Sequence, residues 1–202
     1  ISKDKTTLGL VFSPQDDEAR KVIQPILEKY CNRKIKVIKY TNGCVQLRSS
    51  SRHVIDFFIK LGFNPKQREV ATSIFTAPKE SVIAFLAGLF SSDGTIGMGS
   101  KSRNYVRLNS SSIKLLKQVQ ILLLNLGVKS SIYNRSTKPK IFYYTAKDGS
   151  EKQYETSGVN YEINISKKNL SKFLTLVTFV QQKNINKTSK LLEFEFYNEK
   201  FL

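Results

Sequence analysis

The stretch PKESVIAFLAGLFSSDGTIG, residues 78–97, decides the fold of this chain. Its small side chains, Ala84, Gly88 and Ser91, recur at helical spacing, while bulky apolar side chains fill most of the other positions. Residues at such spacings share one face of an α-helix. The pattern therefore predicts a helix with a face of small residues, against which a second helix backbone can pack closely.

An Asp-Gly pair, Asp93 and Gly94, closes the predicted helix. Glycine is common just beyond the last helical residue, so Asp93 falls in the last turn, where the helix dipole disfavours a negative charge. A divalent cation would compensate for an acid at this place, and Mg²⁺ binds carboxylates, waters and phosphate oxygens. An isolated Asp-Gly pair would instead indicate only a turn that ends a helix.

The segments on either side of this helix form an imperfect repeat. Strand-like alternation in residues 7–13 precedes a helical pattern in 16–30, and the same plan returns in 105–111 and 112–127. The apolar positions of the two predicted helices match one for one: Ala19 with Leu115, Ile23 with Val119, Ile26 with Leu122, Leu27 with Leu123, and Tyr30 with Leu126.

Each copy continues with two strands and a closing helix. The strands are expected at 34–40 and 44–50 and at 129–136 and 160–166, and the helices at 54–63 and 170–179. The second copy has an additional arm at 138–158, in which Asp148 and Gly149 suit a tight hairpin turn. Two such copies predict a pseudo-twofold α+β protein with halves at 1–77 and 78–202. The alternative is an ordinary α+β domain in which similar amphipathic helices recur.

The chain is strongly basic. Lys and Arg number 33 against 16 Asp and Glu, which gives a net charge of +17 over 202 residues. Such a charge repels itself unless a polyanion lies against it, and nucleic acid is the expected partner. A ribosome-associated protein, a binder of anionic membranes and solubilising charge are the alternatives. A membrane surface fits less well, since no helix has an unusually long basic face.

The residues give little support for a zinc or nucleotide site, for a membrane span or for secretion. A single histidine, His53, cannot form a zinc site, and the sequence has no CxxC, HExxH or Gly-rich phosphate loop. No apolar run approaches the roughly 20 residues of a membrane span. Cys31 and Cys44 are expected to pack as small apolar residues in a reducing compartment, which predicts the cytoplasm, the nucleoid or an organelle interior rather than secretion.

The core FLAGLFSSDG, Phe85–Gly94, resembles the motif of the LAGLIDADG homing endonucleases. Its LAGL run is intact, FSS replaces IDA, and the closing DG is retained. The resemblance covers the chain from Pro78 to its end, and the first half only from the family's second strand onward. It implies that two motif helices pack together on a pseudo-twofold axis. Two saddle-shaped antiparallel sheets, backed by helices, would straddle the DNA major groove.

The resemblance implies site-specific cleavage of double-stranded DNA at a long asymmetric target. Asp93, with Gly94, would bind Mg²⁺, or Mn²⁺ or Ca²⁺ in its place. A basic residue would lie near each scissile phosphate, with solvated surface charge as the alternative reading of each candidate. The candidates are Arg68, with Lys66 beside it, in the first half, and Lys187, with Lys183 as a competitor, in the second.

Basic and aromatic residues on the strands would read the DNA. The candidates are Lys34, Lys36, Lys39 and Arg48 in the first half, and Lys101, Arg103, Arg107, Tyr133, Arg135, Lys138 and Lys140 in the second. Lys34 and Lys36 would share one strand face and Lys39 would lie on the other, which makes Lys39 the weaker candidate. The arm at 138–158 would either lengthen the footprint on DNA or form a variable surface loop.

The sequence contains one motif helix where the family has two. Counting back by the repeat offset places the first Asp-Gly pair just ahead of Ile1. A truncated or cleaved product, a split enzyme whose N-terminal fragment supplies the helix, and an assembly with a second copy of the chain are the open explanations. A split or cleaved piece is preferred, because a homodimer would leave both partial repeats without a role.

The sequence is compatible with three functions. The leading one is a Mg²⁺-dependent homing endonuclease of the intein type, because GLFSSDGTIG, residues 88–97, resembles endonuclease domains carried inside inteins. The second is a catalytically inactive DNA-binding or maturase-like RNA-binding remnant of the same fold. The third is a basic structural protein of a nucleoprotein particle.

Overall fold

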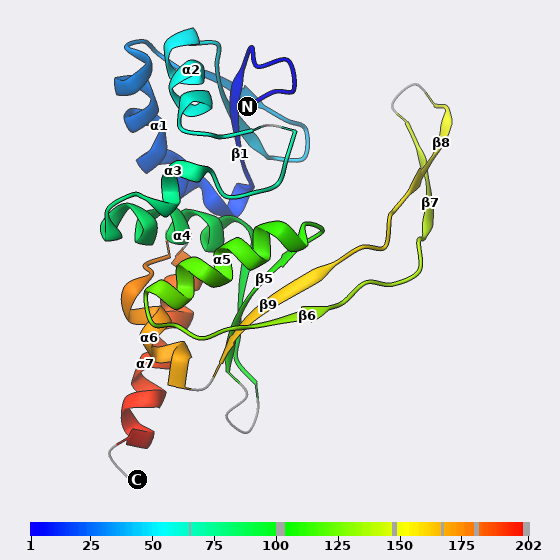
Figure 1. Ribbon diagram of the computed structural model, residues 1–202. Helices are drawn as coiled ribbons and strands as arrows, with labels where there is room; N and C mark the ends of the chain where they lie inside the picture. The colour runs from blue at the N-terminus through cyan, green and yellow to red at the C-terminus, as the bar shows by residue number, and fades with distance from the viewer. Residues whose placement is uncertain (65, 100–103, 147–148, 167, 180–181, 200–202) are drawn as a thin grey trace.

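The computed structural model describes residues 1–64, 66–99, 104–146, 149–166, 168–179 and 182–199. Two halves lie on opposite sides of a central helix, α4 (Lys79–Asp93) (Figure 1). The first half, blue to cyan in Figure 1, contains a three-stranded sheet, and the second half, green to red, contains a four-stranded sheet.

The elements follow the predicted order in both halves. Before α4 come β1 (Leu8–Phe12), a short 3-10 helix η1 (Pro14–Asp16), α1 (Asp17–Cys31), β2 (Lys36–Lys39), β3 (Val45–Ser49), α2 (Arg52–Lys60) and α3 (Thr72–Phe75). After α4 come β4 (Gly94–Gly97), β5 (Tyr105–Ser110), α5 (Ile113–Asn125), β6 (Ser131–Asn134), β7 (Ile141–Thr145), β8 (Glu151–Glu155), β9 (Tyr161–Ser166), α6 (Lys168–Leu176) and α7 (Gln182–Glu199).

Both sheets are antiparallel and share one strand order. The first runs β1-β3-β2 and the second runs β4-β5-β9-β6, so that β1, β3 and β2 correspond to β5, β9 and β6. Within the described ranges, the first sheet has no counterpart of β4. The predicted pseudo-twofold α+β fold, with two antiparallel sheets backed by helices, is confirmed.

Strand register gives the first sheet one buried face and one open face. Leu47 lies opposite Leu10 and Val37, and it is buried against the helices α1 and α2. The next residue along the strand, Arg48, lies opposite Lys36 and is exposed. Because neighbouring residues of a strand point to opposite faces, Lys36 and Arg48 mark the face that no helix covers.

The second sheet is built in the same way around a larger core. Leu108 and Ile163 lie opposite each other on β5 and β9 and are buried under side chains of α4, α5, α6 and α7. The aromatic rings of Phe90 on α4 and Phe173 on α6 pack with their centroids 4.8 Å apart. The helix α4 therefore packs through its bulky residues against the second half.

Matched positions of the two copies are buried to different extents. Phe173 is 0% exposed, whereas its counterpart Phe57 on α2 is 52% exposed. Phe173 packs against Phe90 of α4, and the described residues of the first half supply no helix in the equivalent place beside Phe57. Matching positions in the sequence are therefore not equally buried, because burial also depends on packing helices, and the described part of the first half lacks the one beside Phe57.

The strands β7 and β8 form a two-stranded arm that projects away from both sheets (Figure 1). All of their residues are exposed. Gly149 has a positive φ of 79° at the predicted turn, while Asp148 lies outside the described residues. The arm confirms the hairpin that was expected at 138–158. No helix in the described part of the chain is long and apolar enough to cross a membrane.

Candidate functional site

Asp93 is the last residue of α4, and Gly94 begins the strand β4 directly after it. The carboxylate is exposed and forms no hydrogen bond or ion pair with another residue that the structure describes. Gly94 ends the helix as predicted, but its φ of −84° is extended rather than left-handed. Glycine is needed for space, since an added Cβ would lie 2.3 Å from the backbone oxygen of Phe90.

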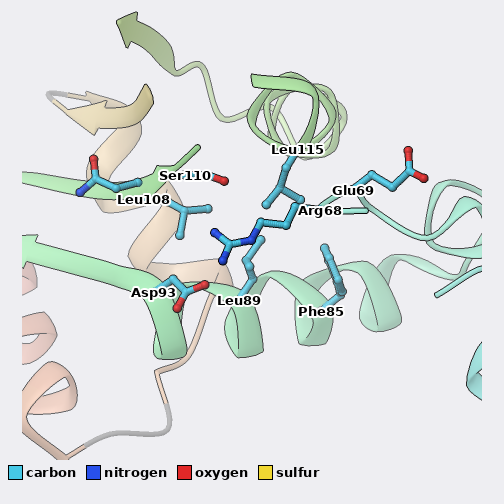
Figure 2. Close-up of a pocket in the computed structure, with 9 residues that line it drawn as sticks. Arg68, Glu69, Phe85, Leu89, Asp93, Leu108, Ser110 and Leu115 are labelled. Atoms are coloured by element: carbon cyan, nitrogen blue, oxygen red, sulfur yellow. The ribbon is translucent and has the colours of Figure 1, made fainter. Parts of the chain in front are cut away.

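Arg68 and Asp93 line the same cavity, which has a volume of about 540 Å³. Figure 2 shows the guanidinium of Arg68 pointing toward the Asp93 carboxylate, with Leu89 of α4 between the two residues along the wall. The remaining lining residues are Glu69, Phe85, Leu108, Asn109, Ser110 and Leu115. Two of the three predicted catalytic residues are thus brought together from separate segments of the chain.

Three contacts with α5 hold the segment that carries Arg68. The Ser112 hydroxyl donates to the Arg68 backbone oxygen at 2.7 Å, and the Val70 amide donates to the Gln118 side chain at 2.9 Å. Lys114 forms an ion pair with Glu69 between these two contacts. The backbone at Arg68 is therefore anchored on the second half, and its side chain is directed into the cavity.

Lys66, the alternative to Arg68, does not line this cavity. It is exposed, and its backbone amide donates to the Asn64 side chain at 3.0 Å in a local turn. Of these two basic neighbours, only Arg68, the preferred candidate, lines the cavity with Asp93.

Lys187 lies on α7, beside the strand that follows Asp93. Its Nζ donates to the backbone oxygen of Ile96 on β4 at 3.2 Å. This contact holds the ammonium group at the strand that begins directly after Asp93. For Lys183, the competing candidate, the side chain lies outside what the structure describes.

Asp93 offers carboxylate oxygens, which are hard ligands of the kind that Mg²⁺ prefers. The Asp93 carboxylate lies at the C-terminal end of a helix, where the negative end of the dipole favours a cation. Among the residues that the structure describes, no group of three or more His, Cys, Asp or Glu side chains could hold a metal ion by itself. Mg²⁺ commonly uses one or two carboxylates and completes its shell with water and phosphate oxygens. Asp93 with the Gly94 carbonyl fits such a partial site.

A second cavity of about 290 Å³ lies on the other side of Asp93, between α4 and the first half. Gly88 and Ser91 line it from α4, and Val11 and Ile23 line it from β1 and α1. An added Cβ at Gly88 would meet nothing within 4 Å, and Val11 is 62% exposed. The small-residue face of α4 is therefore open at its centre.

The predicted DNA-reading residues of the first half divide between the two sheet faces. Lys36 and Arg48 pair on the open face, whereas Lys39 lies opposite Val45 on the other face, which agrees with its weaker ranking. The fourth candidate, Lys34, lies outside the strands.

Lys34 precedes β2, and its Nζ lies 3.1 Å from a carboxylate oxygen of Glu28 on α1. Hydrogen bonds from Gln24 and the Ile35 amide, together with this ammonium group, lower the pKa of Glu28. Lys34 is thus directed toward the helix rather than placed on a strand face with Lys36.

In the second half, Arg107, Tyr133 and Arg135 gather on the open face of the four-stranded sheet, where β5 and β6 flank β9. Lys138 and Lys140 are exposed at the base of the arm. Lys101 and Arg103 lie outside the described residues.

Glu162 was not predicted as a site residue. It lies between Arg107 and Arg135 and is 4% exposed. Alternation in NYEINIS would have placed this acid on the polar face of its strand. Glu69, the acid beside Arg68 in the cavity, was also overlooked.

Residues 80–178 match the family of LAGLIDADG-like domains. The ribonucleoside-diphosphate reductase NrdEB subunit alpha of Bacillus subtilis is 30% identical over 149 residues, which are 73% of this chain and 14% of that protein. The ATP-dependent DNA helicase Hel308 of Methanocaldococcus jannaschii is 32% identical over 91 residues, 45% of this chain and 7% of the helicase. The chain therefore spans only a small fraction of these curated relatives.

Solved structures of the homing endonuclease I-DmoI have a similar fold. A structure of its mesophilic variants matches with a TM-score of 0.59 and 20% identity, over 86% of this chain and 82% of that chain. The complex of I-DmoI with DNA and Ca matches with a TM-score of 0.59 and 20% identity, over 84% of this chain and 74% of that chain. At this identity the likeness shows a common fold.

Proposed function

The chain carries a domain of the LAGLIDADG family, and we propose that it is a site-specific homing endonuclease that cleaves double-stranded DNA with a divalent metal ion. The observation that carries the proposal is the meeting of Arg68 and Asp93 in one cavity of a molecule whose two sheets each have an open basic face. One of these residues precedes the motif helix and the other ends it, so the cavity joins both halves of the molecule.

Four residues fill two roles in this proposal. Asp93 and the carbonyl of Gly94 bind the metal, which is Mg²⁺ or, in its place, Mn²⁺ or Ca²⁺. The ion supplies positive charge at the scissile phosphate and lowers the pKa of a bound water. Arg68 in the Asp93 cavity and Lys187 beside the strand that follows Asp93 would supply positive charge where a phosphate gains negative charge during cleavage. Structures of I-DmoI with DNA and Ca or Mn support a divalent ion in a protein of this fold.

The open sheet faces would lie against the DNA. Lys36 and Arg48 on the first sheet, and Arg107 and Arg135 on the second, supply charge for phosphates and donors for base edges. A net charge of +17 provides long-range attraction. Because the described strands of the two sheets carry different residues, the two halves would contact different sequences, and the target would be asymmetric.

The arm formed by β7 and β8 would lengthen this footprint. Phe142 lies opposite Tyr154, and Tyr144 lies opposite Lys152, so one face of the arm is aromatic and basic. The other face carries Glu151 and Glu155. Only the first face is suited to DNA, because the second would repel its phosphates.

Cleavage of both strands requires a second acid beside Asp93. We propose that another motif helix packs on the open face of α4 at Gly88. The cavity there is lined by α4 and also by Val11 and Ile23 of the first half, which a single added helix would cover together. A second copy of the chain would have to fit its own first half into the same space.

The relatives support a domain carried inside host proteins, as in inteins. A reductase subunit and a helicase have different activities by name. The match to this chain covers 14% of the reductase subunit and 7% of the helicase. A movable domain within unrelated hosts would give this distribution.

A non-catalytic nucleic-acid-binding protein of the same fold is the second candidate. The observation that favours it is the single Asp-Gly motif helix among the described elements, which provides one acid where two are needed. Both candidates would bind DNA and lose affinity as salt rises. Metal-dependent cleavage separates them.

The test uses duplexes selected by the chain from a randomised DNA pool in Ca²⁺, which are then incubated with the chain in Mg²⁺. Asp93→Asn is the informative variant, because it removes the charge and preserves the shape. We expect Mg²⁺-dependent cleavage by the wild-type chain to fall at least about hundredfold in Asp93→Asn. Duplex binding in Ca²⁺ should remain.

Asp56→Asn is the matched control, since it makes the same change of charge at a half-exposed residue of α2 that lines neither cavity. If the wild-type chain binds the selected duplexes but cuts none of them in Mg²⁺ or Mn²⁺, even with a synthetic motif-helix peptide added, the endonuclease proposal fails. The non-catalytic candidate then stands.

A further inference from the structure

Glu162 lies at the centre of a charged cluster on the open face of the second sheet. Its carboxylate oxygens lie 3.4 Å from Nη1 of Arg107 on β5 and 3.2 Å from Nη2 of Arg135, just beyond β6. The Glu162 side chain is 6% exposed, whereas the arginine side chains are 37% and 54% exposed. The acid is thus covered by the two arginines, and their guanidinium groups face outward.

The arrangement is the same on both sides of Glu162. The Arg107 guanidinium lies over the ring of Tyr105 at 5.3 Å, and that of Arg135 lies over the ring of Tyr133 at 5.1 Å. Each side therefore presents a Tyr-X-Arg unit in which the arginine is held by a ring and by one carboxylate oxygen. Two flexible side chains are fixed before any ligand binds.

Phosphate binding alone does not explain this cluster. An acid between two arginines reduces the positive charge of the group, which weakens its attraction to a phosphate backbone. Fixed guanidinium planes are instead the requirement for bidentate donation to guanine O6 and N7 in the major groove. Arg107 also has a buried Nε without a hydrogen-bond partner among the described residues, so Glu162 does not satisfy all of its donors.

We infer that Glu162 is a positioning residue that holds Arg107 and Arg135 to read two guanines of the DNA target. The inference rests on the proposed function and assigns base specificity to one cluster of that interface. Arg107 lies opposite Asn164 and the Arg135 amide bonds to Asn160, so the two backbones are well separated along β9. Both guanidinium groups nevertheless lie within 3.4 Å of the one carboxylate of Glu162, which brings their tips close together. The two guanines should therefore lie within about three base-pair steps, at about 3.4 Å per step.

Selection from a randomised duplex pool in Ca²⁺ tests this inference with the full chain. The wild-type protein should enrich two neighbouring guanines. Glu162→Gln should lower the discrimination at both positions about tenfold, which is the order of one bidentate arginine–guanine contact. Its affinity for a mixed-sequence duplex should stay equal or rise, because a negative charge is removed.

Glu18→Gln is the matched control, because it makes the same change of charge at an exposed residue of α1. It should leave the selected sequence unchanged. Arg107→Lys and Arg135→Lys should each relax one of the two guanine positions, and they keep the test informative if Glu162→Gln does not fold.

Distinct results would overturn the inference. It fails if Glu162→Gln selects the same guanines with the same discrimination, or weakens binding to every duplex alike, as a purely structural role would. It also fails if neither arginine variant relaxes a position. If the wild-type chain enriches no sequence at all, site-specific recognition itself is absent, and the proposed function fails together with the inference.

Discussion

The guanidinium of Arg68 points toward the carboxylate of Asp93 across a shared cavity (Figure 2). Arg68 comes from the segment between α2 and α3, and Asp93 ends α4. Contacts from Ser112, which caps α5, and from Gln118 on α5 anchor the Arg68 segment, so the pair depends on a third element that binds neither side chain directly.

Arg68→Ala should lower the rate of DNA cleavage about hundredfold, the usual effect of removing one donor from a developing negative charge. Cleavage rates under single-turnover conditions measure this effect. Lys66→Ala is the control, because Lys66 is basic and close in sequence but does not line the cavity. Equal losses in the two variants would contradict the role of Arg68.

Gly88→Ala should stabilise the isolated chain by about 0.5–1 kcal/mol, because alanine favours a helix and the added Cβ meets nothing within 4 Å. Chemical denaturation measures this change. If a second motif helix packs on this face, the same variant should weaken cleavage that depends on an added motif-helix peptide. An unchanged response to that peptide would exclude packing at Gly88.

Tyr154→Ala on the arm should weaken DNA binding about tenfold, the order of one aromatic contact with a base. Tyr143→Ala is a matched control, since both tyrosines are exposed but Tyr143 lies opposite Gln153 on the other face. Fluorescence anisotropy with a selected duplex distinguishes them. Equal affinities in the two variants would indicate that the arm is a variable surface loop.

Phe173→Ala should destabilise the fold by about 3–5 kcal/mol, because the ring is fully buried against Phe90. Phe57→Ala, at the matched position of the first half, should cost less than about 2 kcal/mol, since Phe57 is half exposed. Urea denaturation of both variants measures the difference. Similar losses would mean that the first half is covered by a partner under the conditions of the measurement.

Local patterns in the sequence were sufficient to predict the order of elements. The helix that ends at Asp93, the strands and helices of both copies and the inserted arm follow from periodicity and turn residues, which act over short separations. The repeat also predicted two matching halves, and the two sheets do share a strand order, because corresponding segments fold in corresponding ways.

The contacts of the site required the folded chain. The resemblance favoured Arg68 over Lys66, but the meeting of Arg68 with Asp93 depends on the contacts with α5 and its N-cap that hold the intervening segment. Periodicity could not place Glu162 between Arg107 and Arg135 either, because that requires the register of three strands. Residue type and spacing determine which element forms, whereas the side chains that meet are determined by packing between elements distant in sequence.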